Sequence, residues 1–228
     1  MKQEYITKNP YLKGGLLELG FKKKNINSFC RPYNDCVQMI NFGHSTRNEH
    51  YVRYYGIIVG ARFPKVEEFG NKLDVMIGSI GTDIGNLMPN YNHKVWRVTN
   101  SDSIDYIQQV ANDMLVHIVK YAIPFLNKYS TIKELIKGIE NNDKNVCFET
   151  DYNLRVLYLM DGEKELAFSH IERVLGKYEL SGKYNRSDIA WYDSNLINPN
   201  TTNRFYDAYR IFSNKLRDLT KEEETRGM

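Results

Sequence analysis

The chain of 228 residues is 42% hydrophobic and 26% charged, which supports a sizeable core and excludes global disorder. Its formal net charge of +3 is too balanced for a dedicated nucleic-acid-binding protein, which usually presents a strongly basic face. This length suits one domain, or one domain with a closely packed annex.

The N-terminal part predicts a short helix followed by an antiparallel sheet. Residues 11–19 carry leucines at helical spacing, and Gly20 follows where a helix C-terminal glycine belongs. The lysine run at 22–24 is expected to be solvated and to protect a sheet edge. Three runs rich in Val, Ile, Tyr and Phe then predict a three-strand meander. Its strands are expected at Ser28–Tyr33, Cys36–Phe42 and Tyr51–Gly60.

Two further strands are expected at Leu73–Ile80 and Lys94–Thr99, after a connection at 64–71 that can include a helical turn. Three glycines, Gly78, Gly81 and Gly85, accompany the first of these strands. Their spacing matches neither the GxGxxG fingerprint nor a P-loop, so we interpret them as a flexible loop at the sheet edge.

From Asn100 onward the hydrophobic pattern has the period of helices. The first long helix is expected to kink or end at Pro124, which lacks an N–H group. Further helices are expected at 131–139, 151–159, 163–178 and from Thr201 or Thr202 to about Leu219. The polar segment 181–200 has Trp191 as its expected anchor, and residues 221–228 are expected to form a charged tail.

The sequence therefore predicts an α+β fold. A short N-terminal helix and an antiparallel sheet of four to five strands are followed by a helical C-terminal half that packs on the sheet. Residues 1–100 form the predicted sheet region and residues 101–228 the predicted helical region, packed as one compact unit.

The cysteine pattern and the hydropathy predict a cytoplasmic protein without a membrane role. Cys30, Cys36 and Cys147 fit neither a disulfide framework nor a zinc site. No run approaches the ~18 apolar residues of a membrane span, and no secretory signal is recognised. Cys30 and Cys36 lie in predicted strands and are expected to be unreactive.

The sequence carries no motif of a known catalytic site, neither GxSxG nor HExxH. His44 and His50 flank a predicted hairpin loop, with Glu49 beside them. This leaves open an enzyme that acts on a small ligand or depends on a metal, with a site near the 43–50 loop. Two local imidazoles are fewer than the ligands of a zinc site, so we expect no metal, no cofactor and no catalytic residues.

Arginine and tyrosine recur on the predicted strands. Arg31 and Tyr33 share a face of the first meander strand, Arg53 and Tyr55 share a face of the third, and Arg97 lies in the last strand. Both residue types are enriched at binding hot spots, so these five are the predicted binding residues. The alternative is a solvated face with ordinary cation–π and cross-strand pairs.

Three segments resemble an uncharacterised bacterial family, the domain of unknown function 4304. They read LLELGFKKKN with FCR, CVQMINFGHS and YYGIIVGARFP, and they cover residues 16–64, with further similarity at YAIPFL (121–126) and Ala167. The chain departs from the family pattern at 25–27, where Asn-Ile-Asn replaces a glycine and small polar residues. The motif is structural, and the family has no established activity. The resemblance implies an immunity protein that accompanies a toxin system.

The leading hypothesis is a protein that binds another macromolecule, as an immunity or adaptor protein with a protein partner. The second is the enzyme with a site near the 43–50 loop. The third is nucleic-acid binding through the lysines at 22–24 with Arg31 and Arg53, which the charge balance disfavours. The sequence makes no prediction of the oligomeric state.

Overall fold

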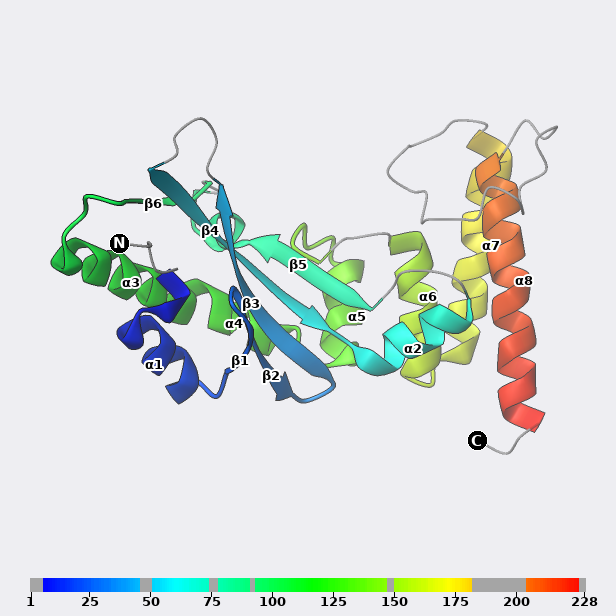
Figure 1. Ribbon diagram of the computed structural model, residues 1–228. Helices are drawn as coiled ribbons and strands as arrows, with labels where there is room; N and C mark the ends of the chain where they lie inside the picture. Colours follow the sequence, from blue (N-terminus) through cyan, green and yellow to red (C-terminus); the bar gives the residue numbers. More distant parts are fainter. Residues whose placement is uncertain are drawn as a thin grey trace. The chain divides into compact units, whose positions relative to one another are not determined.

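The computed structural model describes residues 6–45, 51–73, 78–90, 93–146, 150–181 and 204–225. The chain divides into two compact units. The sheet unit comprises Met1–Phe63 and Ser79–Val146, and the helical unit comprises Pro64–Gly78 and Cys147–Met228. The fold is α+β, as predicted: a short N-terminal helix, an antiparallel sheet and then helices (Figure 1).

The sheet unit is built on a six-stranded antiparallel sheet with the order β1-β2-β3-β4-β5, in which β6 also pairs with β4. The predicted meander is confirmed as β2, β3 and β4, each antiparallel to the next. The strands are β1 (Lys22–Asn25), β2 (Ser28–Tyr33), β3 (Cys36–Ser45), β4 (Val52–Arg62), β5 (Ser79–Asp83) and β6 (Trp96–Thr99).

Along one edge, the long strand β4 pairs with two shorter strands, one after the other. Its first residues, Val52–Tyr55, pair with β6, and its last residues, Ile58–Arg62, pair with β5. At the opposite edge of the sheet, the lysine run forms strand β1, whose four residues are all exposed. Exposed lysines on an edge strand discourage pairing with another chain, so this run has the edge-protecting position that the sequence predicted.

The predicted bounds of the fourth strand were wrong. Helix α2 (Pro64–Lys72) occupies the preceding segment, and β5 begins only at Ser79, after Gly78 with φ +87°. The interpretation of the three glycines as a loop was wrong for Gly81, which lies within β5 opposite Gly60, whereas Gly78 and Gly85 lie outside the strand. A Cβ atom at Gly60 would lie 2.5 Å from the carbonyl oxygen of Ile80, so the two strands approach too closely there for a side chain.

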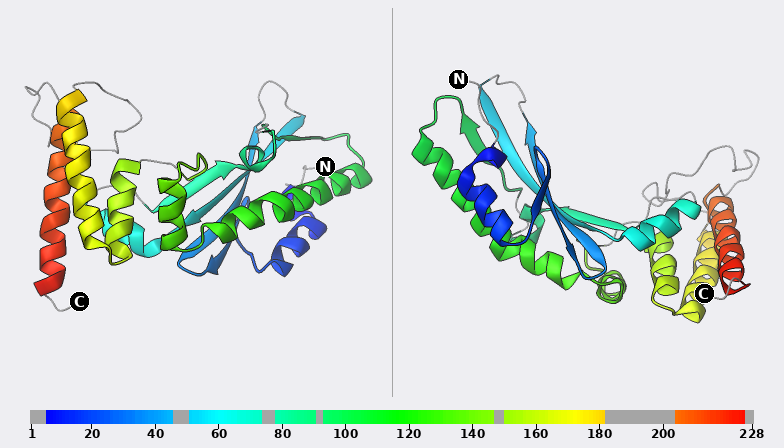
Figure 2. Two further views of the ribbon diagram at one scale, coloured as in Figure 1. Left: turned by 180° about the vertical axis from the view of Figure 1, so that it is seen from behind. Right: turned by 60° about the horizontal axis from the view of Figure 1, so that its bottom comes forward.

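Helices cover one face of this sheet. Figure 2 shows α1 (Pro10–Glu18) and α3 (Ile104–His117) lying on the same side of the strands. The Asn9 side chain accepts hydrogen bonds from the first free N–H groups of α1, and Gly20 follows this helix with φ +84°. Phe29, Ile40 and Val59 stand opposite one another in register, are fully buried, and form the centre of the core on this face.

The helix that begins at Ile104 does not end at Pro124. It widens into a π-helical segment, Ile118–Ala122, and continues as α4 (Ile123–Lys128) with Pro124 in the first turn. Proline cannot donate a backbone hydrogen bond. Just before it, the Ile123 N–H group donates to the carbonyl of Ile118, five residues back, which is the bond that defines a π-helical turn. The sequence leaves Ser130 and Thr131 as alternative caps for the next helix. This helix, α5 (Ile132–Glu140), is capped by Thr131.

The helical unit contains α2, α6 (Thr150–Met160), α7 (Lys164–Ser181) and α8 (Arg204–Thr225). Gly162, with φ +85°, forms the predicted turn between α6 and α7. The sequence predicts a packed apolar stripe on the last helix, with residues at helical spacing: Phe205, Ala208, Tyr209, Phe212, Leu216 and Leu219. Tyr209, Phe212 and Leu216 are confirmed as core, because they are fully buried and α8 packs against α7. The predicted contact of this stripe with the Ile118 helix, which belongs to the other unit, stays a prediction.

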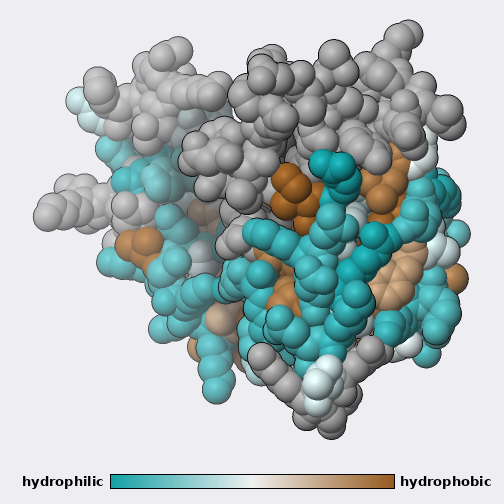
Figure 3. Space-filling view, turned by 90° about the vertical axis from the view of Figure 1, so that its right-hand side faces the viewer, coloured by the Kyte–Doolittle hydropathy of each residue, from teal (hydrophilic) through white to brown (hydrophobic). Residues whose placement is uncertain are grey.

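The predicted end of the last helix at Leu219 was too early, since α8 continues to Thr225. Lys221 and the three glutamates that follow are good helix formers, and the next glycine comes only at Gly227. Figure 3 shows the side of the molecule on which α8 lies as mainly hydrophilic, with scattered hydrophobic side chains. The expected cap at Thr201 or Thr202, the anchor Trp191 and Cys147 lie outside the described residues.

Among the helices described, none combines the length and the apolar character needed to cross a membrane.

Candidate functional site

The second face of the sheet, opposite α1 and α3, carries side chains that remain accessible. Along β4, Tyr55 and Ile57 are buried under the helices, whereas Ile58 on the opposite face is 48% exposed. Tyr54 and Gly56 share the face of Ile58 because side chains alternate along a strand. We call this second face the open face.

A hollow of about 470 Å³ lies on the open face. Gly43 on β3 stands opposite Gly56 on β4, so two neighbouring positions lack side chains and leave space above the strands. Nothing lies within 4 Å of the place that a Cβ atom at Gly43 would take. Side chains around the hollow include Tyr54, Ile58, Asp83, His93 and Val95.

Both apolar and charged side chains line this hollow. Ile58 is 48% and Val95 43% exposed, so both leave apolar surface accessible beside the hollow. The Asp83 carboxylate accepts a hydrogen bond of 2.8 Å from the Gly85 N–H group, and its other oxygen lies 4.0 Å from Nδ1 of His93. The hollow can therefore take an apolar group beside one fixed negative charge.

Positive charge dominates the strands. In the six strands described, seven side chains are basic and one, Asp83, is acidic. Arg97 and Arg62 are exposed on the open face, where Arg97 pairs with Tyr54 and Arg62 with Ser79. The seven basic side chains are Lys22, Lys23, Lys24, Arg31, Arg53, Arg62 and Arg97.

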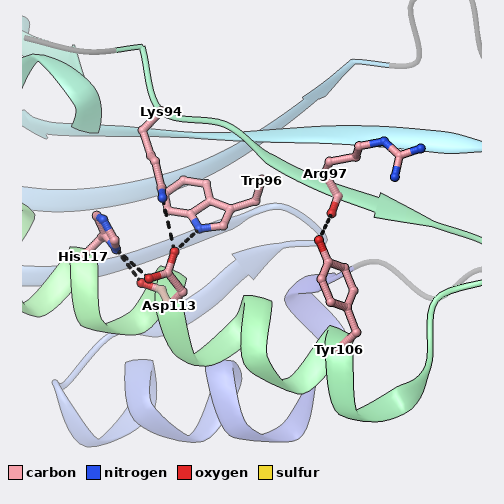
Figure 4. Close-up of polar contacts among 6 residues, drawn as sticks. All are labelled: Lys94, Trp96, Arg97, Tyr106, Asp113 and His117. Carbon is pink, nitrogen blue, oxygen red and sulfur yellow. Dashed lines mark hydrogen bonds and ion pairs between the residues drawn. The ribbon is translucent and has the colours of Figure 1, made fainter.

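Strand β6, which follows Val95 and carries Arg97, is held on its covered face by Asp113 of α3 (Figure 4). Asp113 accepts a hydrogen bond of 2.7 Å from Nε1 of Trp96, and Nζ of Lys94 lies 3.4 Å from it. Nδ1 of His117 lies 3.4 Å from the other carboxylate oxygen. Burial alone would raise the pKa of the Asp113 carboxyl, but these three neighbours hold it below its usual value.

A separate contact with α3 holds the backbone of Arg97. Its carbonyl oxygen accepts a hydrogen bond of 3.2 Å from the Tyr106 hydroxyl, and Figure 4 shows its guanidinium group directed away from α3. Alternation along β6 places Trp96 against α3 and Arg97 on the open face. Of the five predicted binding residues, Arg97 is the one on the open face beside the hollow, because it pairs with Tyr54, which lines the hollow.

Arg31 lies instead on the helix-covered face. Its Nε donates to Oε1 of Gln38 over 2.8 Å, and its other nitrogens donate to the Leu19 carbonyl and to Oδ1 of Asn127. The guanidinium carbon lies 5.0 Å from the ring centre of Tyr33, which is 38% exposed. Burial lowers the pKa of Arg31 from its usual value. These contacts give Arg31 a packing role.

Tyr55 and Arg53 also belong to the covered face. Tyr55 is 1% exposed, and its hydroxyl accepts a hydrogen bond of 3.4 Å from the Ile6 N–H group. Arg53 is half-buried opposite Val98 of β6. The predicted five residues are therefore divided between two faces: the structure brings Arg31 and Tyr33 together but separates both from Arg97.

The alternative site near the 43–50 loop is described only in part. His44 lines the hollow, whereas Glu49 and His50 lie outside the described residues. Among the residues described, no group of three or more His, Cys, Asp and Glu side chains could hold a metal ion. Burial, with the Asp35 charge, raises the pKa of the Cys36 thiol to about 11, so this cysteine is protonated and unreactive at neutral pH.

The profile of the family described as domain of unknown function (DUF4304) matches residues 12–128, just over half of the chain. The chain belongs to this family. No curated protein and no solved structure matches it significantly. The DUF4304 region runs from the first turn of α1 through the six strands to the end of α4, so the whole hollow lies within the family domain.

Sequence reasoning missed the pair of glycines that forms the hollow, together with Ile58, Asp83, His93 and Val95. The signal for the glycine pair was present, because Gly43 and Gly56 lie at equal distances from the centre of the hairpin that joins β3 and β4. Recognising this pair requires the register of the hairpin, which the sequence alone did not determine.

Proposed function

We propose that this DUF4304 chain is a non-catalytic, immunity- or adaptor-like protein of the bacterial cytoplasm that binds an acidic polypeptide segment on its open face. The observation that carries the proposal is the hollow at Gly43 and Gly56, which exposed Ile58 and Val95 border. Pockets of this kind accept the buried apolar anchor around which protein interfaces are organised.

The charge of the strands favours an acidic partner. On the open face, the exposed strand arginines Arg62 and Arg97 outnumber Asp83, the acidic side chain of the strands described, although the whole chain is nearly balanced at +3. Arg97 and Arg62 present this charge on the open face. Complementary charge steers association and selects the partner, and arginine forms paired hydrogen bonds with carboxylates.

The same surface favours a polypeptide over a nucleic acid. A nucleic acid carries a phosphate on every nucleotide, and one placed in the hollow would meet the Asp83 carboxylate. A polypeptide can place an apolar side chain in the hollow and its carboxylates near Arg97 and Arg62. Arg31, one of the residues suggested for nucleic-acid contact, is engaged with Gln38, Leu19 and Asn127.

Peptide display on the full chain tests this proposal. Random peptides would be selected on the wild-type protein and counter-selected on a Gly43→Leu variant, which places a side chain in the hollow at a position where the Cβ atom meets nothing within 4 Å. The expected enriched peptides are acidic and carry an aromatic or aliphatic residue. Enrichment of basic peptides would overturn the proposal. So would a result in which the wild type and Gly43→Leu retain the same peptides. Stronger retention of single-stranded DNA or RNA than of peptides at low salt would favour nucleic-acid binding instead.

A further inference from the structure

A second concave site lies in the sheet unit, away from the hollow. It is a cleft of about 450 Å³ between the segment after β5, the π-helical turn with α4, and the loop after α5. A volume of this size is typical of small-molecule sites. Its apolar wall is formed by Leu87, Met88, Pro89, Pro124 and Phe125.

A chain of hydrogen bonds holds one side of the cleft in place. Nδ2 of Asn86 donates to the Thr82 hydroxyl, which donates to Oδ1 of Asn145, both over 3.1 Å. The Asn145 N–H group donates to Oδ1 of Asp143 over 3.0 Å, and the Tyr129 hydroxyl donates to Oδ2. The polar groups of the cleft are thus fixed before any ligand arrives, which lowers the entropic cost of binding.

The charges of the cleft favour an anion. The lining includes Lys120, Lys128 and Asp143. Both oxygens of Asp143 already accept hydrogen bonds, and Nζ of Lys128 lies 3.5 Å from Oδ2, so little of this carboxylate is left for a cation. Tyr129 and Asp143 raise the pKa of Lys128, which keeps its charge. Lys120 is exposed, with its ammonium 5.1 Å from the ring centre of Tyr121.

The π-helical turn contributes two residues to the cleft. Lys120 and Tyr121 both belong to Ile118–Ala122, and both line the cleft. Segments of π-helix are rare and occur often at functional sites, where they alter the direction of side chains. Here the widened turn supplies a cation and an aromatic ring to the cleft wall.

We propose that this cleft binds a small organic anion, with its carboxylate or phosphate between Lys120 and Lys128 and its apolar body against Pro124 and Phe125. The site is distinct from the open face and does not depend on the function proposed for that face. The ligand is a monoanion or dianion with one flat or compact apolar group, because Lys120 and Lys128 line the same cleft as the apolar side chains of Pro124 and Phe125.

Four probes with the same ring test the charge requirement in the full chain: benzoate, phenyl phosphate, phenol and benzylamine. Each would be titrated into ¹⁵N-labelled protein while the amide signals of residues 86–89, 120–129 and 143–145 are followed by NMR. We expect the two anions to shift these signals at millimolar concentration and the neutral and cationic probes to leave them unchanged. Lys120→Gln should weaken anion binding by roughly tenfold.

Lys133→Gln is the matched control, because Lys133 is an exposed lysine of α5 that does not line the cleft. It should bind the anions as the wild type does. Absence of anion-induced shifts in the cleft, equal binding of phenol or benzylamine, or equal affinity of Lys120→Gln and wild type would each overturn the proposal. A retained amide spectrum for Lys120→Gln separates loss of binding from loss of folding.

Discussion

Arg31 and Gln38 stand opposite each other on β2 and β3, and Nε of Arg31 donates to Oε1 of Gln38 over 2.8 Å. Nε2 of Gln38, which is fully buried, donates to the Leu126 carbonyl over 2.9 Å. Arg31 also reaches the end of α1 at Leu19. This pair therefore connects the end of α1 and helix α4 to the sheet.

Replacing Arg31 with alanine should lower the free energy of unfolding by about 2–3 kcal/mol, because a charge-assisted network is lost and a buried amide oxygen keeps no donor. Lys133→Ala, a surface substitution, should change it by about 0.5 kcal/mol or less. Urea denaturation followed by circular dichroism measures both. A variant Arg31→Ala with wild-type stability but impaired peptide binding would contradict the packing role and restore Arg31 as a binding residue.

The close approach of β4 and β5 predicts different effects for two strand glycines. Gly60→Ala should destabilise the protein by about 1–3 kcal/mol, because the new methyl group would lie 2.5 Å from the Ile80 carbonyl oxygen. Gly43→Ala meets nothing within 4 Å and should be close to neutral. Thermal melts of the two variants side by side check this contrast. Equal melting temperatures would show that β5 does not lie as closely as described.

The Asp113 contacts predict a dependence of stability on pH. The pKa of this carboxyl is lower in the folded protein than in the unfolded chain, so it stabilises the fold above its unfolded pKa of about 3.9 and loses this effect as the pH falls through the folded value. Asp113→Asn should therefore melt below wild type at about pH 7, and the difference should shrink at about pH 3. A difference that does not change with pH would attribute the effect to packing alone.

The aromatic cluster of the helical unit predicts a large effect at Phe212. Its ring lies 5.0 Å from that of Tyr152 and 6.3 Å from that of Tyr209, measured between centres, and it is fully buried. Phe212→Ala should cost about 3–5 kcal/mol through the cavity it leaves. Asn214→Ala, exposed on the same helix, is the control. A melting temperature equal to that of the control would contradict the core position of Phe212.

A chain shortened to end at Lys221 should melt close to the full chain. The last helix runs on to Thr225, but Lys221, Glu222 and Thr225 are exposed, so the final turn adds little buried surface. Differential scanning calorimetry measures the change. A strongly lowered melting temperature would show that the final turn contributes to the core.

Local signals predicted most of the fold. The strand Ser28–Tyr33 was predicted with its bounds, because turn residues at 34–35 separate it from the next apolar run. The start of β5 was not, because the apolar run from Leu73 passes from a helix end to a strand, and composition does not distinguish the two. Pro124 correctly indicated that the long helix is irregular near this position. The form of the irregularity, a π-helical turn, depends on how α3 and α4 pack.

The candidate site could be predicted far less well, since it depends on register and on where the helices pack. Alternation placed Arg31 with Tyr33 correctly on one face, yet only the packing of α1 and α4 decides that this face is covered. The pairing of Gly43 with Gly56 is likewise a property of two strands together. Neither property is present in a single segment of sequence.

The most direct test of the proposed function is isothermal titration calorimetry with an acidic peptide selected on the wild-type chain. Gly43→Leu should weaken its binding by roughly tenfold or more, since a filled hollow cannot accept the anchor side chain. Gly176→Leu, where a Cβ atom also meets nothing within 4 Å, places the same substitution in the helical unit and should bind as wild type does. Arg97→Glu should weaken binding through charge. Unchanged affinity for Gly43→Leu would contradict the assignment of the open face as the binding surface.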